Sequence, residues 1–538
     1  MSAIASMGKL YSLYFSGCTF SNEVFGMLGN IQAPLKTLSF DGCVGVESYS
    51  AISGMKYLQK LYIENCDLTD EQLASIDFGA IEYLNVVYLD GNQQLTDISP
   101  LGAVKLLNEL KLDKTAVHDF SSLADCNILN RVSAQECGIT DISTLTNKTI
   151  QYLYLTDNNI SDISVVSGYK ALGTLYLGNN SVSDLSPLSG LQLLDELDIQ
   201  KNQVSDLSPL SSCQRLISLR VNDNNITTLA PLSEMQRLKY LYAGSNRLTD
   251  LTGLENSLLL ESLDVSENQI ENIDGITNCT VLEKVDFSIN NISDISLLKK
   301  SVATLERVYF NSNNVSDISC LAGAENLEYL SFDFNHVKDL DALSASTKLW
   351  LISAESNEIT SIDGIAGAKT LKYVFLPHNE IESMEAISDL TPREENDFAL
   401  IDLSNNKITE LRLSSKKSYS YLAVYNNPLT SVSDAGETHG GYFLFSYQDG
   451  MTFPEFRQAY NYYYIIDCPK EKQVAVNDEI RGTRTFSVGS GVIFGTAEEA
   501  DAQIREEKSI VLGNSTAKTD ESGADSSESA VPETVAEN

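Results

Sequence analysis

Apolar side chains recur along this chain at a fixed interval. Ile150, Leu153 and Leu155 are each matched by an apolar residue 22 positions later, at Leu172, Leu175 and Leu177. The leading apolar residue of each later repeat keeps this frame, with a one-residue slip before the sixth: Leu194, Leu216, Leu238, Leu260, Leu282, Leu305, Leu327, Leu349 and Leu371. A constant period of this length is typical of an array of short stacked units.

The same frame extends less regularly toward both ends. Upstream, the leading positions are Leu10, Leu35, Leu58, Leu84, Leu107 and Leu129, and downstream they are Phe398 and Tyr419. Together these positions predict about nineteen coils within residues 1–430.

The spacing within each repeat predicts a short strand followed by a turn. In x-L-x-L-x the two leucines face one side of a strand, because successive side chains alternate between faces. One coil buries six or seven apolar side chains worth ~2 kcal/mol each, while ordering its residues costs on the order of 30 kcal/mol. A coil is therefore stable only between neighbours that share its apolar face. We expect an α/β solenoid: a parallel sheet on one side, with short turns or 3₁₀ segments on the other.

The pattern L-x-x-L-x-L-x-x-N-x-I, together with second halves such as Ser183–Leu188, resembles the 22-residue class of leucine-rich repeats. This class occurs in bacterial internalins and in a eukaryotic regulatory subunit of protein phosphatase 1. The resemblance covers roughly residues 1–430 and implies a horseshoe whose sheet is concave and whose turns are convex. Internalins also carry an N-terminal helical cap and an immunoglobulin-like domain after the repeats, and neither is recognisable in this sequence.

Asparagine recurs where the chain leaves each strand. We interpret these residues as structural, because a buried amide can satisfy the backbone groups of a tight turn. They are Asn158, Asn180, Asn202, Asn224, Asn246, Asn268, Asn290, Asn313, Asn335, Asn357 and Asn379, and early coils place Cys18, Cys43, Cys66 and Cys137 in the same position.

Two further sets of recurring residues suggest chemistry but are better explained by structure. Cys126, Cys213 and Cys279 share one position and are expected to be buried thiols, and the odd total of nine cysteines without C-x-x-C spacing argues against disulfides and zinc. Recurrent aspartates precede each second half, where a carboxylate can cap free N–H groups. One carboxylate per coil does not supply the six to eight oxygens of a calcium site. These aspartates are Asp97, Asp119, Asp141, Asp162, Asp184, Asp206, Asp250, Asp294, Asp317 and Asp339.

The side chains between the leucines point away from the predicted core and form two columns. The first column is the residue before the second apolar site of each repeat, and the second column is the residue after it. The fold requires no ring at either column. Nevertheless, the first column contains Tyr152, Tyr240, Tyr329, Tyr373 and Tyr421, and the second contains Tyr14, Tyr62, Tyr88, Tyr154, Tyr176, Tyr242, Tyr309 and Phe375.

Two explanations of these rings remain open. One is the preference of tyrosine for strands, and the other is a recognition surface, where tyrosine offers rigid contact area with a polar tip. The second column also carries Asp198, Arg220, Asp264 and Asp286. On the second explanation, the partner-binding residues are Tyr62, Tyr88, Tyr152, Tyr154, Tyr176, Asp198, Arg220, Tyr240, Tyr242, Asp264, Asp286, Tyr309, Tyr329, Tyr373 and Phe375.

Net charge narrows the choice of partner. The chain carries 37 basic and 74 acidic residues, a formal net charge of -37. Nucleic acid and anionic membrane surfaces would be repelled, and no apolar run is long enough to insert into a bilayer. We expect a basic or mixed-charge protein partner. The alternatives are a carbohydrate- or cell-wall-binding surface protein and a regulatory subunit that docks an enzyme.

Nothing in the sequence points to catalysis. The four histidines, His118, His336, His378 and His439, fall in different coils or outside the array, without H-E-x-x-H spacing. No G-x-S-x-G or phosphate-binding glycine loop occurs. We therefore expect a non-catalytic module without a cofactor or a metal.

The ends of the repeat array set the expected domains. Residues 1–430 form the solenoid, residues 431–512 a C-terminal cap or small α+β module, and residues 513–538 an acidic, Ser/Thr-rich tail without a core. Ile4–Leu10 resembles the tail of a coil, which predicts that the chain begins inside a longer array. With no export signal visible, the default location is cytoplasmic, and a missing upstream segment would permit a cell-surface or secreted location.

Overall fold

A computed structural model of the chain describes residues 9–31, 33–387, 399–412, 419–433, 442–449, 462–482 and 491–524. The chain divides into two compact units, unit 1 (Met1–Ile292) and unit 2 (Ser293–Asn538). Residues 1–8, on which the expected truncation rests, lie outside the described residues, and so do residues 525–538 of the predicted tail.

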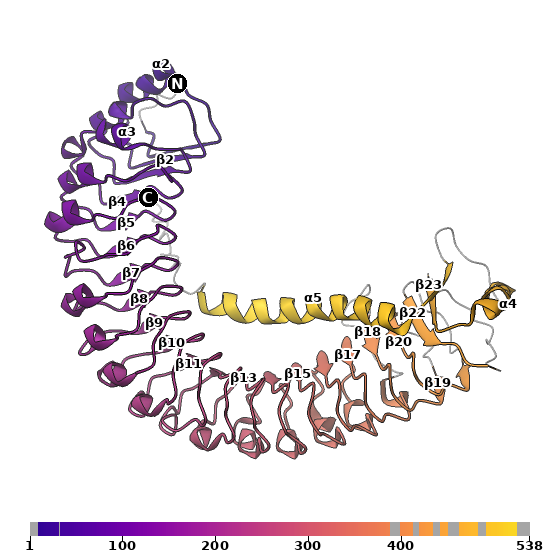
Figure 1. The fold of residues 1–538 in the computed structure, drawn as a ribbon. Helices are drawn as coiled ribbons and strands as arrows, with labels where there is room; N and C mark the ends of the chain where they lie inside the picture. The colour runs from indigo at the N-terminus through magenta and orange to yellow at the C-terminus, as the bar shows by residue number, and fades with distance from the viewer. Residues whose placement is uncertain are drawn as a thin grey trace, which may run out of the picture. The chain divides into compact units, whose positions relative to one another are not determined.

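Unit 1 is a run of short parallel strands, one in each of thirteen coils (Figure 1). Equivalent residues of successive coils pair in register, so Leu153 pairs with Leu175 and Tyr154 with Tyr176. The strands are β1 (Ser12–Ser16), β2 (Thr37–Asp41), β3 (Lys60–Glu64), β4 (Val86–Tyr88), β5 (Glu109–Lys111), β6 (Arg131–Ser133), β7 (Tyr152–Tyr154), β8 (Thr174–Tyr176), β9 (Glu196–Asp198), β10 (Ser218–Arg220), β11 (Tyr240–Tyr242), β12 (Ser262–Asp264) and β13 (Lys284–Asp286).

The second half of most coils in unit 1 forms a short helical segment on the side opposite the strands (Figure 1). Two coils have a turn of α-helix, α2 (Asn22–Gly26) and α3 (Asp70–Ala74), and most others have a 3₁₀ segment. Ser21 caps α2, and Thr69 with Gln72 forms a capping box on α3. The predicted arrangement of a parallel sheet with 3₁₀ segments opposite is confirmed.

Unit 2 continues the same plan with parallel strands (Figure 1). Beyond residue 430, β22 (Tyr442–Ser446), β23 (Tyr462–Ile466) and β24 (Gly491–Gly495) still pair in parallel. A separate parallel pair is formed by β19 (Glu410–Arg412) and β21 (Ser431–Ser433). The strands are β14 (Arg307–Tyr309), β15 (Tyr329–Ser331), β16 (Leu351–Ser353), β17 (Tyr373–Phe375), β18 (Ala399–Asp402), β19 (Glu410–Arg412), β20 (Tyr419–Ala423), β21 (Ser431–Ser433), β22 (Tyr442–Ser446), β23 (Tyr462–Ile466) and β24 (Gly491–Gly495).

Two longer helices belong to unit 2, α4 (Lys470–Gly482) and α5 (Ala497–Ala524). Helix α5 therefore includes the first part of the acidic segment at 513–538 that the sequence assigns to a tail. Among the described residues, no helix combines the length and the hydropathy needed to cross a bilayer.

The core of each coil lies between its strand and its 3₁₀ segment. In one coil, Leu153 and Leu155 of the strand side, Ile160 and Ile163 of the turn, and Val166 of the 3₁₀ segment are all fully or almost fully buried. These are the positions that the 22-residue pattern marks as apolar, so the pattern and the observed core coincide.

The predicted structural role of the asparagines is confirmed by their hydrogen bonds. The Oδ1 of Asn202 accepts from the N–H of Val182 in the preceding coil at 2.8 Å. Its Nδ2 donates to the carbonyl of Leu177, also in the preceding coil, at 2.9 Å. Nδ2 also donates to the carbonyls of Ile199 and Gln200 at 3.1 and 3.0 Å. Each amide thus links two coils through backbone groups that would otherwise be buried without partners.

The residue before each asparagine adopts a left-handed backbone conformation. Its φ lies between 51° and 59° at Asp157, Lys201, Ser245 and their equivalents up to His378, and none of these residues is glycine. The turn therefore carries a conformational cost in each of these coils, which the asparagine hydrogen bonds offset.

The cysteines and the recurrent aspartates are also structural. Cys126, Cys213 and Cys279 are buried, as expected from the sequence, and burial raises the pKa of each thiol, which disfavours the thiolate form. Asp184 accepts from the N–H of Ser186, two residues on, at 2.8 Å, and Asp206 accepts from Ser208 in the same way. Hydrogen bonds with Ser208 lower the pKa of Asp206. The predicted capping role is confirmed.

Candidate binding surface on the strand faces

The two columns predicted from the sequence lie on the strand face, the side of each sheet turned away from the 3₁₀ segments. From β3 to β11 of unit 1, the tyrosines of both columns are partly exposed while the apolar residues beside them are buried, as in β7, where Leu153 separates Tyr152 and Tyr154. Tyr14 of β1 is more exposed, at 65%. Among the described residues of unit 1, the helical segments lie on the opposite side (Figure 1).

The first part of the unit 1 strand face contains Tyr62 and Tyr88, whose ring centroids are 4.7 Å apart. Lys111 of the next strand lies over Tyr88, with Nζ 4.6 Å from the ring centroid. The hydroxyl of Tyr88 donates to Glu109 at 2.7 Å. The two rings are therefore fixed by neighbouring strands and expose only part of their surface.

The middle of the unit 1 strand face is a cluster formed by four successive strands. The Tyr154 and Tyr176 rings meet edge to face with centroids 5.2 Å apart. Arg131 lies 4.3 Å from the ring centroid of Tyr152 and donates to the hydroxyl of Tyr154 at 2.8 Å. The hydroxyl of Tyr176 donates to Glu196 at 3.1 Å. This cluster, the 131–196 cluster, holds three rings in defined positions at the surface.

Next along unit 1 lie Asp198, Arg220 and the tyrosines of β11. Asp198 is buried and accepts from the N–H of Gln200 at 3.0 Å, and burial raises its pKa. The guanidinium of Arg220 lies 4.4 Å from the ring centroid of Tyr242. Tyr240 donates to Glu261 at 2.9 Å. The carboxylate of Asp198 is thus buried and hydrogen-bonded to the backbone of its own coil, so it has a structural role.

The last two predicted acids of unit 1 also stabilise turns. Asp264 accepts from the N–H of Ser266 at 3.0 Å, and Asp286 accepts from the N–H of Ser288 at 2.9 Å. Burial and the neighbouring Asp264 carboxylate raise the pKa of Asp286. Replacing either carboxylate by a cation would remove a turn hydrogen bond as well as reverse a charge.

The four predicted residues in unit 2 are placed differently. Phe375 is fully buried, Tyr329 and Tyr309 are buried at 7% and 9% exposure, and Tyr373 is half-buried. The expectation that both columns are free of packing is wrong here. Tyr309 and Tyr329 form one apolar cluster with Leu351 and Val511, and Phe375 belongs to a second, because α5 packs on this strand face.

Helix α5 lies along the strand side of unit 2 (Figure 1). One stripe of its side chains contacts that face. Ala500 and Ile504 are buried in the cluster that also contains Phe375, Leu400 and Tyr421. Polar bonds add to this contact: Gln503 Nε2 donates to the hydroxyl of Tyr421 at 2.6 Å, and Tyr425 donates to Asp501. The helix covers side chains that the sequence predicts to be exposed.

Lys508 of α5 is held by Asp333, Glu355 and Phe375 of the strand face, a group that we call the lysine pocket. Its Nζ donates to Asp333 Oδ2 at 2.8 Å and to Glu355 Oε2 at 3.0 Å, and it lies 5.4 Å from the ring centroid of Phe375. Burial alone would lower the pKa of Lys508, but the carboxylates of Asp333 and Glu355 raise it above its usual value. The pocket therefore holds a charged ammonium group.

Sequence reasoning missed this lysine pocket for two reasons. Asp333 and Glu355 lie outside the two columns, at the residue after the third apolar site, and Lys508 lies outside the repeats. A signal was present, because the columns of unit 2 become apolar at Leu351, Phe375 and Leu400, where unit 1 is mainly polar or tyrosine. A column of that kind predicts a covering element.

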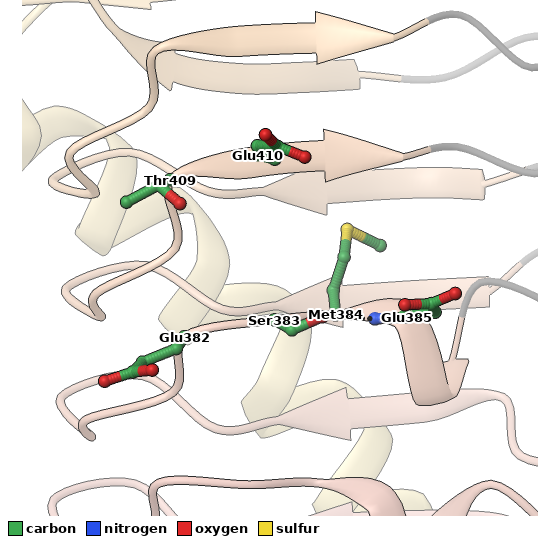
Figure 2. Close-up of a pocket in the computed structure, with 6 residues that line it drawn as sticks. All are labelled: Glu382, Ser383, Met384, Glu385, Thr409 and Glu410. Carbon is green, nitrogen blue, oxygen red and sulfur yellow. Dashed lines mark hydrogen bonds between the residues drawn. The ribbon is translucent and has the colours of Figure 1, made fainter.

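A small hollow of unit 2 does not qualify as a site. It is lined by Glu382, Ser383, Met384, Glu385, Thr409 and Glu410, and the three carboxylates lie apart from one another (Figure 2). Among the residues that the structure describes, no three His, Cys, Asp or Glu side chains are grouped so as to hold a metal ion.

Comparisons with known proteins agree with the repeat pattern. Family models described as leucine-rich repeats match residues 146–167, 170–212 and 214–256. No curated protein matches the sequence.

Several solved structures share the fold. A leucine-rich-repeat protein of Leptospira interrogans is 22% identical, over 74% of this chain and 98% of that one, with a TM-score of 0.59. The functional domain of InlJ from Listeria monocytogenes is 21% identical, over 70% and 76%, with a TM-score of 0.52. The plant peptide hormone receptor RGFR1, in complex with RGF2, is 17% identical, over 92% and 81%, with a TM-score of 0.63. At these identities the similarity establishes the fold.

Proposed function

We propose that this chain, which contains leucine-rich repeats, binds a protein partner of basic or mixed charge through the strand face of unit 1. The 131–196 cluster carries this proposal. Its tyrosines are fixed by neighbouring strands before any partner arrives, so little side-chain freedom is lost on binding. Rigid aromatic side chains with polar tips are the type of residue that dominates binding energy at protein interfaces.

Charge supports the choice of partner. Glu109, Glu196 and Asp264 lie beside the rings of unit 1, and the chain as a whole has a formal net charge of -37. Arg131 and Arg220 are held over tyrosine rings. The acids would attract a basic partner, and the two arginines add donors for a mixed one.

The structural neighbours are consistent with a binding role. RGFR1 is a peptide hormone receptor solved with RGF2 bound, and another similar structure, PEPR1, is in complex with AtPEP1. For this chain we propose a binding module without catalytic activity.

The test compares two pairs of tyrosines in the full chain. Tyr154→Ala with Tyr176→Ala removes two rings of the 131–196 cluster. The matched control is Tyr57→Ala with Tyr83→Ala, a stacked pair whose centroids are 6.3 Å apart and which precedes the strands β3 and β4. Both pairs are read out by affinity capture with mass spectrometry, by binding affinity for any captured polypeptide, and by a glycan array.

We expect a polypeptide retained by the wild type and by the control pair, with an affinity at least tenfold lower for the cluster pair. This corresponds to about 1.4 kcal/mol of binding free energy. Equal retention by both variants would exclude the 131–196 cluster. Retention on glycans without any polypeptide would favour the carbohydrate alternative instead.

A further inference from the structure

The lysine pocket of unit 2 has the construction of a binding site for an ammonium group. Asp333 Oδ1 accepts from the hydroxyl of Ser353 at 2.7 Å and from the N–H of Glu355 at 2.8 Å, which leaves Oδ2 directed at Lys508. Glu355 supplies the second carboxylate, and the Phe375 ring lies beside the ammonium. The carboxylate of Asp333 is thus held by the strands themselves and does not depend on the helix for its position.

A further carboxylate increases the negative charge of this pocket. Asp402 of β18 is 5% exposed and accepts from the N–H of Ser404 at 2.9 Å. Burial raises the pKa of Asp402, and the positive charge of Lys508 opposes that rise. Buried carboxylates without a cation are unfavourable, so an element that covers this pocket must supply an ammonium or guanidinium group.

The apolar part of the contact between α5 and the strand face is small. Among its described side chains, Ala500 and Ile504 are the buried apolar ones, and Ile510 is exposed. The contact stripe of Ala497, Ala500, Ile504, Lys508 and Val511 follows helical spacing. The other surface of the helix carries charged, exposed residues such as Glu498 and Glu506.

The helix also has its own start signal. The N–H of Thr496 donates to Glu499 at 2.9 Å, and the N–H of Glu499 donates to Thr496 Oγ1 at 3.2 Å. This reciprocal capping stabilises the first turn from within the helix. The hydroxyl of Tyr464 in β23 also donates to Glu499 at 3.4 Å, so the strands contact this turn as well.

From these observations we infer that the strand face of unit 2 binds a lysine-bearing amphipathic helix of a partner protein, and that α5 is the built-in competitor occupying it. The partner helix would present a small residue, an aliphatic residue and a lysine at successive four-residue intervals, as Ala500, Ile504 and Lys508 do. Binding requires α5 to leave, so this face is inhibited by the chain's own C-terminal helix. The inference goes beyond the proposed role of unit 1 and does not depend on it.

The test uses the full chain with two matched charge reversals on α5. Lys508→Glu places a carboxylate in the lysine pocket, whereas Arg505→Glu makes the same change of charge at an exposed position of the same helix. Hydrogen–deuterium exchange is followed for the amides of α5 and of β15, β16 and β17. The probe is a labelled peptide with the sequence of residues 495–512, and a second peptide carries Lys508→Glu.

We expect α5 amides to exchange at least tenfold faster in Lys508→Glu than in the wild type, with β15–β17 still protected and Arg505→Glu unchanged. The probe should bind the Lys508→Glu chain at least tenfold more tightly than the wild-type chain, because the competitor is weakened. When Asp333→Asn and Glu355→Gln are added to the Lys508→Glu chain, the tighter binding of the probe should be lost. The second peptide, which carries Lys508→Glu, should not bind the Lys508→Glu chain more tightly than the wild-type chain.

Three results would overturn the inference. One is equal binding of the probe to the wild-type and Lys508→Glu chains. Another is equal exchange of α5 in both. The third is loss of protection in β15–β17 together with α5, which would make the helix a permanent part of the unit 2 core. Lys508→Gln, which introduces no like charge, separates that last case from simple repulsion. The Tyr154→Ala and Tyr176→Ala pair should leave probe binding unchanged, so failure here is distinguishable from failure of the unit 1 proposal.

Discussion

At the scale of single residues, the repeat imposes one unusual backbone conformation in every coil. The residue before the recurrent asparagine of a coil has a positive φ, and this position is filled by Asp, Asn, Lys, Ser or Glu in most of unit 1. Short polar side chains tolerate this conformation because they hydrogen-bond locally. Ile289 is the exception in unit 1, with a φ of 56° and a β-branched side chain that is 53% exposed.

Ile289 is therefore a position where the chain can be stabilised. Ile289→Asn should raise the free energy of unfolding by about 1 kcal/mol, because asparagine adopts the left-handed conformation with less strain. Urea unfolding of the two proteins measures the difference. Leu258, equally exposed at 53% and without a positive φ, supplies the control. A stabilisation of the same size in Leu258→Asn would attribute the effect to lost surface hydrophobicity instead.

At the scale of structural elements, neighbouring coils are joined by three kinds of contact. The strands pair in register, the apolar side chains stack, and the asparagines link the turns. The amide of Asn202 is the partner of one N–H and three carbonyls. Its loss would leave buried backbone groups without these hydrogen bonds.

Replacement of one such asparagine should strongly lower the free energy of unfolding. Asn202→Ala is expected to lower the free energy of unfolding of unit 1 by about 2–4 kcal/mol. The neighbouring Gln203 is exposed, so Gln203→Ala should change the free energy of unfolding by less than about 0.5 kcal/mol. Chemical denaturation followed by exchange of the β8, β9 and β10 amides measures both. Similar small losses in the two variants would show that the asparagine bonds contribute little beyond strand pairing.

Also at this scale, the strand faces of the two units have different environments. In unit 1 the tyrosines contact arginines and glutamates of adjacent strands. In unit 2 the equivalent columns pack under α5. The same repeat thus presents a preorganised polar and aromatic surface in one unit and a helix-covered surface in the other.

At the scale of the whole molecule, the excess of acidic residues is the dominant property. A formal net charge of -37 over 538 residues produces repulsion within the folded chain. Repulsion between like charges is weakened by salt, since the screening length falls from about 30 Å at 0.01 M to about 8 Å at 0.15 M. Compact folding brings these charges closer together than unfolding does.

Salt should therefore stabilise the protein. Raising sodium chloride from about 0.01 M to about 0.15 M is expected to increase the unfolding temperature by a few degrees, because screening reduces the repulsion mainly in the folded state. Differential scanning calorimetry gives the shift, and potassium chloride at the same ionic strength controls for a specific ion. A decrease in the unfolding temperature would mean that ion pairs such as Arg215 with Asp195 outweigh the general repulsion.

The sequence alone predicted the fold because each coil repeats one local pattern. The leucine spacing identified the strands and the buried set, and the asparagine and aspartate positions identified their hydrogen-bonding roles before any coordinates. These features depend on residues within one coil or in adjacent coils, so a 22-residue pattern contains the information.

Only the tertiary structure decided which parts of the strand face are accessible. Phe375 and Tyr329 occupy the same columns as Tyr154 and Tyr152, yet they are buried because α5 packs on them. The lysine pocket likewise joins Asp333 to Lys508, 175 residues apart in the chain. A periodic pattern specifies contacts between neighbouring repeats, whereas the docking of a non-repeating helix depends on packing and charge that meet only after the coils have stacked.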